Sequence, residues 1–329
     1  MNTEANKSQK PSKFRRIRHF FIIIATLYIL ICIATYFFQD RLIFMRQKTS
    51  GEVPALSTGV NSIEDIELIM SDGIRLRGWF LRNSTSEKSN LLIYFGGNAE
   101  EVSRIIPKMS HLSNWSIALI NYRGYGESEG NPYEKVLYSD SLEIYDYFSN
   151  KEDIDKNNIV IMGRSIGTGV ATYLSQKRPA SSVILVSPYD TLTNVAKGKL
   201  PFLPVNLLLK NKFDSISRAA DIKAPLLMLV AAEDTLIPPH LSTRVAKAWG
   251  GKVYWEEIAG EDHNSIDDGE IYWNKINEFL SNEISTPVVS SIPVPTNTPD
   301  LTIDISKDPV YAICLNKTLK AELLIKKCL

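Results

Sequence analysis

The chain has 329 residues, of which 37 are Lys or Arg and 37 are Asp or Glu, so its formal net charge at neutral pH is zero. A nucleic-acid-binding protein normally carries a basic surplus that neutralises phosphates, so this balance argues against one. Hydrophobic residues make up 44% and charged residues 22%, which excludes general disorder and supplies a large core. None of the three cysteines lies in a C-x-x-C pair, which argues against structural zinc and thioredoxin-type redox chemistry.

The N-terminal part of the chain has the pattern of a membrane anchor. Residues 1–19 carry six Lys or Arg and one acidic residue, and residues 20–38 (FFIIIATLYILICIATYFF) follow without a charge. A helix of this length measures about 28 Å, which nearly spans the hydrocarbon of a bilayer. The run ends on Tyr-Phe-Phe and not on a small-x-small cleavage site. It therefore predicts an uncleaved transmembrane anchor rather than a signal peptide or a buried globular helix.

The distribution of positive charge predicts the orientation of this anchor. The basic segment 1–19 outweighs the three basic residues of the connector 39–61, which are Arg41, Arg46 and Lys48. The positive-inside rule then places the N-terminus in the cytoplasm and the rest of the chain on the non-cytoplasmic side. We therefore expect a single-pass membrane protein in which segment 1–19 is cytoplasmic.

Between about residues 62 and 282, strand-like apolar runs alternate with helix-like segments, which is the pattern of an α/β domain. Eight runs are predicted to be strands: 65–70, 74–81, 91–95, 116–121, 158–163, 182–187, 225–231 and 252–258. In the first two runs, polar and apolar residues alternate on either side of a Ser-Asp-Gly turn, which predicts an antiparallel hairpin at a sheet edge. Most of the later runs are nearly all apolar, as in strands buried on both faces. Helices are predicted at 100–110, 133–150, 166–177, 242–249 and 269–280.

Three further segments carry weaker signals. Residues 188–224 contain the run LPFLPVNLLL, which predicts a core-facing helix with its lead-in. The alternative is a small cap that lines an acyl pocket or dips toward the bilayer. Residues 283–300 contain four prolines and predict a linker. The tail 301–329 is too short to form its own core. Export of the domain would permit a disulfide between Cys314 and Cys328 in this tail.

The strongest chemical signal is the pentapeptide Gly163-Arg164-Ser165-Ile166-Gly167, which fits the pattern G-x-S-x-G. It follows the apolar run NIVIM and precedes a predicted helix, and a sharp strand-to-helix turn at such a place holds a serine hydroxyl out of the sheet. Gly163 and Gly167 form the expected nucleophile elbow, because a side chain at either position would collide with the neighbouring strand or helix. Ser165 is the predicted nucleophile.

A serine hydroxyl needs a base, and that base needs an orienting acid. His263 is the candidate base, because it lies in a polar loop after the last predicted strand. The other histidines lack that context: His19, His111 and His240. The acid is expected after a strand between the serine and the histidine, and Asp234 fits the order Ser…Asp…His. Glu233 and Asp190 remain as alternatives to Asp234.

An oxyanion hole needs two backbone N–H groups. One is expected from Ile166, directly after the nucleophile, and the other from Asn98 in the loop that follows the strand LLIYF. Gly96 and Gly97 precede Asn98 and would let the main chain approach a substrate carbonyl closely. An ordinary strand-to-helix turn is the alternative interpretation of this loop.

Together these residues resemble the α/β-hydrolase superfamily, and more closely its small membrane-anchored serine hydrolases, an acyl hydrolase and depalmitoylase-like subgroup. The likeness is carried by GRSIG and by four other segments: Gly96-Gly97-Asn98-Ala99, Arg123-Gly124-Tyr125-Gly126-Glu127-Ser128, Asp234 to Pro238, and His263-Asn264. It covers about residues 62–282, and Gly96 departs from it, since the family usually has histidine there.

The resemblance implies an α/β-hydrolase fold, with a mostly parallel eight-stranded sheet, helices on both faces and one preceding transmembrane helix. It also implies hydrolysis of acyl esters or thioesters, and some animal relatives remove palmitate from proteins. The expected partners are therefore an acyl substrate, such as a lipid or a lipidated protein, and the membrane.

Two other functions compete with this interpretation. A serine peptidase of the prolyl-oligopeptidase type shares the fold and triad but is expected to carry a large accessory domain, and the chain has only the short anchor region before the sheet begins. A non-catalytic scaffold on a hydrolase fold would not need the three catalytic residue types. No Walker A sequence, dinucleotide fingerprint or metal-ligand cluster is apparent, so neither a cofactor nor a metal is expected.

Overall fold

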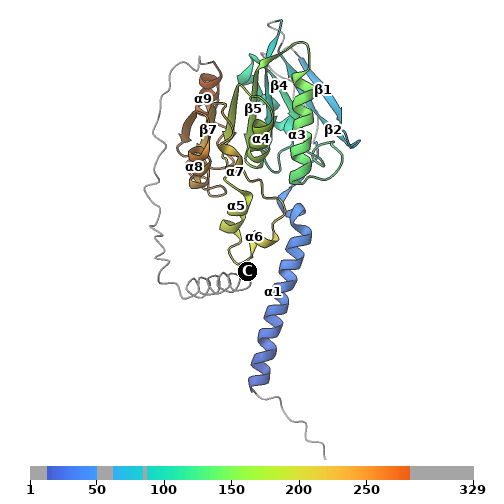
Figure 1. Cartoon of the computed structure of the whole chain (residues 1–329), viewed down its shortest axis with the longest axis vertical. Coiled ribbons are helices and arrows are strands. Elements are labelled where there is room, and N and C mark those ends of the chain that lie inside the picture. The colour runs from blue at the N-terminus through green and yellow to red at the C-terminus, as the bar shows by residue number, and fades with distance from the viewer. Residues whose placement is uncertain (1–12, 50–61, 84–86, 282–329) are drawn as a thin grey trace, which may run out of the picture. The chain divides into compact units, whose positions relative to one another are not determined.

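The computed structural model of the chain describes residues 13–49, 62–83 and 87–281 (Figure 1). The predicted linker 283–300 and tail 301–329, with Cys314 and Cys328, lie outside these residues. Helix α1, Lys13–Ile43, contains the predicted anchor and continues past it. By length and composition it is able to cross a membrane, and none of its most apolar stretch is buried within the protein.

Eight strands form one sheet in the order β1-β2-β4-β3-β5-β6-β7-β8. Their bounds are β1 Ser62–Ile69, β2 Arg75–Arg82, β3 Ser89–Phe95, β4 Trp115–Ile120, β5 Ile154–Arg164, β6 Ser182–Val186, β7 Leu226–Ala231 and β8 Val253–Ile258. The predicted antiparallel hairpin at the sheet edge is confirmed as β1 and β2. β2 also pairs antiparallel with β4, and all the other pairs are parallel.

Helices cover both faces of the sheet, and α3 and α4 lie across its strands in Figure 1. The longer helices are α3 Glu134–Ser149, α4 Ile166–Lys177, α8 Pro239–Ala248 and α9 Glu270–Ser281. Alternate residues of β3 belong to different cores: Leu91, Ile93 and Phe95 pack with α3 and α4, whereas Leu92 and Tyr94 pack with α9. This is why the central strands are apolar at nearly every position.

Two predicted elements differ in the structure. The helix expected at 100–110 is divided into η1 Val102–Ile105, α2 Ile106–Met109 and η2 Ser110–Leu112. Pro107 lies in the first turn of the short α2 and has no N–H to continue a helix from the preceding turn. The segment 188–224 forms three short helices, α5 Leu192–Lys199, α6 Val205–Leu208 and α7 Ile216–Ala219, in place of one longer core-facing helix. Of these, α5 packs the partly buried Leu192 and Val195 against the core.

The segment RGYGES after β4 is anchored by its arginine. Arg123 is 5% exposed, and its Nε and Nη2 donate to the two carboxylate oxygens of Asp140 on α3 at 2.8 and 2.6 Å. Its Nη1 donates to Asp72 in the turn between β1 and β2 at 2.5 Å. A bidentate arginine fixes direction as well as distance. Arg123 therefore joins the loop after β4 to helix α3 and to the edge hairpin.

Candidate active site

Ser165 lies at the junction between β5 and α4, with φ of 52° and ψ of −120°. L-residues rarely adopt this strained backbone conformation, and here it ends the strand and begins the helix without an intervening loop. The turn requires the glycines on both sides. A Cβ at Gly163 would lie 2.4 Å from the carbonyl oxygen of Gly167, and a Cβ at Gly167 would lie 2.1 Å from that of Phe95.

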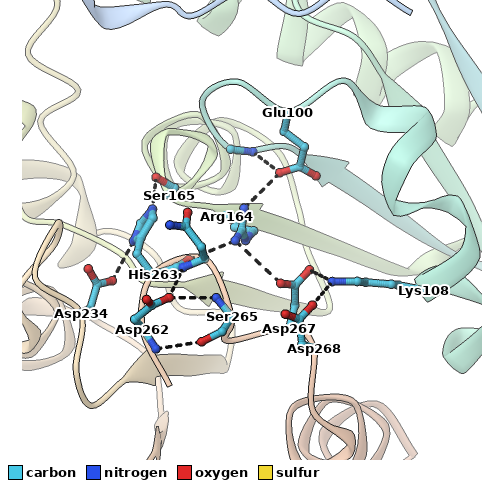
Figure 2. Close-up of polar contacts among 12 residues, drawn as sticks. Glu100, Lys108, Arg164, Ser165, Asp234, Asp262, His263, Ser265, Asp267 and Asp268 are labelled. Atoms are coloured by element: carbon cyan, nitrogen blue, oxygen red, sulfur yellow. Dashed lines mark hydrogen bonds and ion pairs between the residues drawn. The ribbon is translucent and has the colours of Figure 1, made fainter. Parts of the chain in front are cut away.

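The structure brings Ser165, His263 and Asp234 together (Figure 2). His263 Nε2 lies 2.9 Å from Ser165 Oγ, and its Nδ1 lies 2.7 Å from Asp234 Oδ2. A carboxylate only accepts, so Nδ1 carries the proton and Nε2 is the acceptor for the serine hydroxyl. All three residues are at most 8% exposed. The arrangement allows a proton to pass from the serine to the imidazole.

The loop after β7 orients the Asp234 carboxylate. Its Oδ1 accepts hydrogen bonds from the backbone N–H groups of Leu236 and Ile237 at 2.9 and 2.7 Å, which leaves Oδ2 facing His263. Burial raises the pKa of this carboxyl, but the hydrogen bonds from His263 and Ile237 lower it, and the net pKa is below its usual value. Asp234 is therefore ionised at neutral pH.

Both alternative acids have other surroundings. Asp190 Oδ2 accepts from Arg244 at 2.9 Å and from Asn194 at 2.7 Å, so its carboxylate is held at the start of α5. Glu233 is exposed.

The other histidines of the chain also lie in different surroundings. His111 stacks on Trp273, and His19 and His240 are exposed on α1 and α8.

A short turn holds the histidine loop. Asp262 Oδ1 accepts from the backbone N–H groups of Asn264 and Ser265 at 2.8 and 3.0 Å, and Ser265 Oγ accepts from the N–H of Asp262 at 3.0 Å. Asp and Ser commonly form such local bonds in turns. His263 lies inside this turn, so its backbone position is fixed independently of its side-chain contacts.

Sequence reasoning missed the roles of Arg164 and Glu100. Arg164 Nη2 donates to the backbone oxygen of His263 at 3.0 Å, and its guanidinium lies 3.5 Å from Glu100 and 3.8 Å from Asp267 (Figure 2). Burial by itself lowers the pKa of Arg164, but Tyr94, Glu100 and Asp267 raise it overall. The sequence did contain a signal for this role, because Arg164 is a charged residue at the end of a buried strand, where a charge without a partner is energetically costly.

Glu100 carries this network into the loop after β3. Its Oε2 accepts from the backbone N–H of Gly97 at 2.7 Å, and its Oε1 accepts from the Tyr94 hydroxyl at 2.7 Å. Arg164 and Glu100 together therefore connect the histidine loop, the end of β5 and the loop that contains Asn98. This connection links three of the four segments that carry predicted site residues.

The two predicted oxyanion donors lie at the expected loops. Ile166 is the first residue of α4, and neither its backbone N–H nor that of Asn98 donates to another residue in the described part of the chain. The loop after β3 approaches the serine, since a Cβ at Gly97 would lie 3.6 Å from Ser165 Cβ. The Gly97 N–H is already bonded to Glu100, which leaves Asn98 as the free donor of the pair.

The side chain of Asn98 has a role that the sequence did not indicate. Its Oδ1 accepts hydrogen bonds from the Tyr125 hydroxyl at 2.9 Å and from the backbone N–H of Met45 at 2.9 Å. Met45 belongs to the segment that leaves α1, and Tyr125 belongs to the segment RGYGES. Asn98 is therefore held from two sides, one of which is the segment that directly follows α1.

A polar cleft of about 330 Å³ opens beside this loop. Its lining includes Asn98, Glu100, Arg104, Lys108, Arg164 and Asp267. The apolar side chains of Ala99 and Ile105 also contribute to this lining. Within residues 13–49, 62–83 and 87–281, no group of three or more His, Cys, Asp or Glu side chains is arranged to hold a metal ion.

Comparison with known proteins agrees with this architecture. Residues 94–211 match the family described as the alpha/beta hydrolase fold. The protein Rv2307c of Mycobacterium tuberculosis is 30% identical over 247 residues, which cover 74% of this chain and 87% of that protein. The chain belongs to the α/β-hydrolase fold family.

Two further relatives come from eukaryotes. The alpha/beta hydrolase domain-containing protein WAV2 of Arabidopsis thaliana is 29% identical, over 74% of this chain and 87% of its own length. A yeast protein, the membrane protein YNL320W of Saccharomyces cerevisiae, is 27% identical, over 76% of this chain and 92% of its own length.

Solved structures share the fold at low identity. An α/β hydrolase of Vibrio vulnificus is 19% identical with a TM-score of 0.60, over 85% of this chain and 98% of that structure. The Pyrococcus furiosus esterase Pf2001 is 17% identical with a TM-score of 0.57, over 72% of this chain and 96% of that structure. At these identities the likeness establishes the fold alone.

Proposed function

We propose that this protein is a serine hydrolase that cleaves carboxylic ester or thioester bonds. The observation that carries the proposal is the chain of two hydrogen bonds from Ser165 through His263 to Asp234, at 2.9 and 2.7 Å. A neutral imidazole between a serine hydroxyl and a carboxylate is the arrangement that makes serine nucleophilic. The esterase structures that share the fold support an ester as the substrate class.

In the proposed reaction, Ser165 Oγ attacks the acyl carbon while His263 Nε2 takes the hydroxyl proton. The resulting oxyanion accepts hydrogen bonds from the backbone N–H groups of Ile166 and Asn98. The imidazolium then gives its proton to the departing alcohol or thiol, which leaves an acyl-serine. A water molecule repeats the sequence and releases the acid. Asp234 stays ionised throughout and stabilises the imidazolium.

We also propose that α1 anchors the protein in a membrane, with its basic N-terminal side in the cytoplasm and the hydrolase domain on the other side. The length and composition of α1 support the anchor, and a relative described as a membrane protein agrees with it. The orientation rests on the basic residues before the apolar run.

Labelling with a fluorophosphonate probe tests the proposed activity. The probe phosphonylates a serine only when that serine is activated as a nucleophile. We expect one adduct, located on Ser165 by mass spectrometry, and no adduct in Ser165→Ala. Ser175→Ala is the matched control, because Ser175 lies on the same helix α4 and bonds only to the carbonyl of Ala171. An unlabelled native protein would favour the scaffold alternative.

A further inference from the structure

The uncharged segment 200–209 (LPFLPVNLLL), which contains α6, lies along the anchor helix α1. The Tyr28 hydroxyl donates to the carbonyl oxygen of Phe202 at 3.0 Å. At the other end of the segment, the Gln39 side-chain amide donates to the Leu208 carbonyl at 2.9 Å and accepts from the N–H of Lys210 at 2.7 Å. The segment is therefore bonded to α1 at two separate levels.

The distance between these two levels matches half of a bilayer. Tyr28 and Gln39 are 39 − 28 = 11 positions apart on one helix, which is about 16 Å at 1.5 Å per residue. The hydrocarbon core of a membrane is about 30 Å thick. If Gln39, directly after the uncharged run, lies at the membrane surface, Phe202 lies near the bilayer centre.

The exposed side of the segment is mostly apolar, with Asn206 as its one exposed polar residue. Phe202 is 63% exposed and Leu207 is 82% exposed, whereas Leu203 and Val205 face inward and are buried. Basic residues flank the segment on both sides: Lys197, Lys199, Lys210 and Lys212. Apolar side chains bounded by lysines are the pattern of an element that enters a bilayer from its surface.

Most backbone N–H groups of the segment donate to carbonyls of the protein. The N–H groups of Leu203, Val205, Leu207, Leu208 and Leu209 all donate to carbonyls within residues 200–205. Pro201 and Pro204 have no N–H, and α1 supplies the donors for Phe202 and Leu208. In water such exposed groups need no protein partner, but in lipid an unpaired backbone group is energetically costly.

We propose that residues 200–209 lie in the hydrocarbon of the leaflet that holds the C-terminal half of α1, as a second membrane-embedded element. The acyl chains of the bilayer therefore contact the exposed face of the segment. The proposal rests on the membrane anchoring proposed above. It also specifies the substrate class, because Lys199, directly before the segment, contacts the loop that holds Asp234.

Two hydrogen bonds connect the membrane-embedded parts to the active site. Lys199 Nζ donates to the carbonyl of Thr235, the residue after Asp234, at 2.6 Å. Met45, shortly after the end of α1, donates to Asn98. The proposed catalytic loops therefore lie next to the membrane surface, and the substrates are esters or thioesters whose acyl chains reside in the bilayer.

Depth-dependent fluorescence quenching tests the position of the segment. The full chain, with Cys32, Cys314 and Cys328 replaced by serine, would carry one fluorescent label at Phe202→Cys and be reconstituted in phosphatidylcholine vesicles. Ile271→Cys on α9 is the matched control, since Ile271 is 62% exposed against 63% for Phe202. Leu27→Cys, next to Tyr28, reports on the anchor itself.

We expect doxyl lipids to quench the labels at residues 202 and 27, more strongly with the doxyl group deep in the acyl chain, and to leave the label at 271 unquenched. Quenching at 27 without quenching at 202 would overturn the embedded segment and leave the anchor intact. Absence of quenching at both would overturn the anchor as well. Protection of 202 from both lipid and aqueous quenchers would overturn the proposal in favour of a protein partner.

Turnover gives the second readout. For Phe202→Asp and Leu207→Asp, the ratio of activity on a vesicle-embedded long-chain ester to activity on a soluble short-chain ester is expected to fall by about tenfold or more, because each change removes a large apolar side chain from lipid. Ile271→Asp is expected to leave this ratio unchanged. An unchanged ratio in Leu207→Asp would contradict the proposed substrate class. If the native chain cleaves neither ester, the proposed hydrolase function is contradicted.

Discussion

At the scale of single residues, Asp234 and Asp190 are both buried aspartates that follow neighbouring strands, but their partners differ. Asp234→Asn places an N–H where the imidazole needs an acceptor, so we expect kcat/KM to fall by up to about 10⁴-fold. Asp190→Asn is the control, because that carboxylate bonds to Arg244 and not to a catalytic residue. Kinetics on the purified folded variants decide the assignment. A larger loss in Asp190→Asn would mean that the acid is misassigned.

The lowered pKa of Asp234 gives a prediction about pH. Because its pKa lies below the usual value, the Asp234 carboxylate stays charged when the solution is acidified from neutral pH, so one protonation, that of the base, limits catalysis. We expect kcat/KM to rise through about pH 6 to 7.5 and then level off, with a slope of one on logarithmic axes. A slope of two would show that a second group titrates. A flat profile from pH 5 to 9 would contradict histidine as the base.

Much of the candidate site was predictable because strand ends can be located from sequence. Ser165, Asp234 and His263 each follow a predicted strand, and in a parallel sheet such ends meet at one edge. The contact between Arg164 and Glu100 was not predictable. It joins side chains from two loops whose conformations depend on the whole fold, and no local pattern encodes their distance.

At the scale of elements, the junction between β5 and α4 depends on Gly167. A methyl group there would lie 2.1 Å from the Phe95 carbonyl and 2.6 Å from that of Gly96. We expect Gly167→Ala to lower the free energy of unfolding by about 1–3 kcal/mol or more, since the strand and loop must shift. Denaturant unfolding in detergent measures this loss.

Gly198 on α5 provides the control for that change. Nothing lies within 4 Å of the Cβ that alanine would add there. Alanine restricts the unfolded chain and favours helix, so Gly198→Ala is expected to be neutral or to stabilise by about 0.4–1 kcal/mol. If Gly167→Ala were as stable as Gly198→Ala, the close packing at the junction would not be a constraint.

The elements themselves were predictable to different degrees. All eight strands overlap the predicted runs. The central strands were predictable because burial on both faces of a sheet leaves an apolar run, and β1 and β2 because their polar and apolar residues alternate. The segment 188–224 was not predictable, since LPFLPVNLLL is equally apolar whether it faces a protein core or lies outside it. Contacts with α1, far away in sequence, determine that choice.

At the scale of the whole molecule, the orientation in the membrane follows from charge. Six basic residues precede the apolar run, so we expect the hydrolase domain on the non-cytoplasmic side. Protease added to sealed vesicles with the cytoplasmic face inside is expected to digest the domain. Protection there, with digestion when the cytoplasmic face is outside, would reverse the orientation. Thioester removal from cytoplasmic lipidated proteins would then be favoured.

Ser165 and His263 are proposed to act as one catalytic unit, and turnover of a short-chain aryl ester measures whether they do. We expect Ser165→Ala and His263→Ala each to lower kcat by about 10⁴-fold or more, and the double variant to cost little beyond either single change. His240→Ala, at an exposed site on α8, is expected to retain activity. Near-normal turnover by Ser165→Ala would contradict the mechanism.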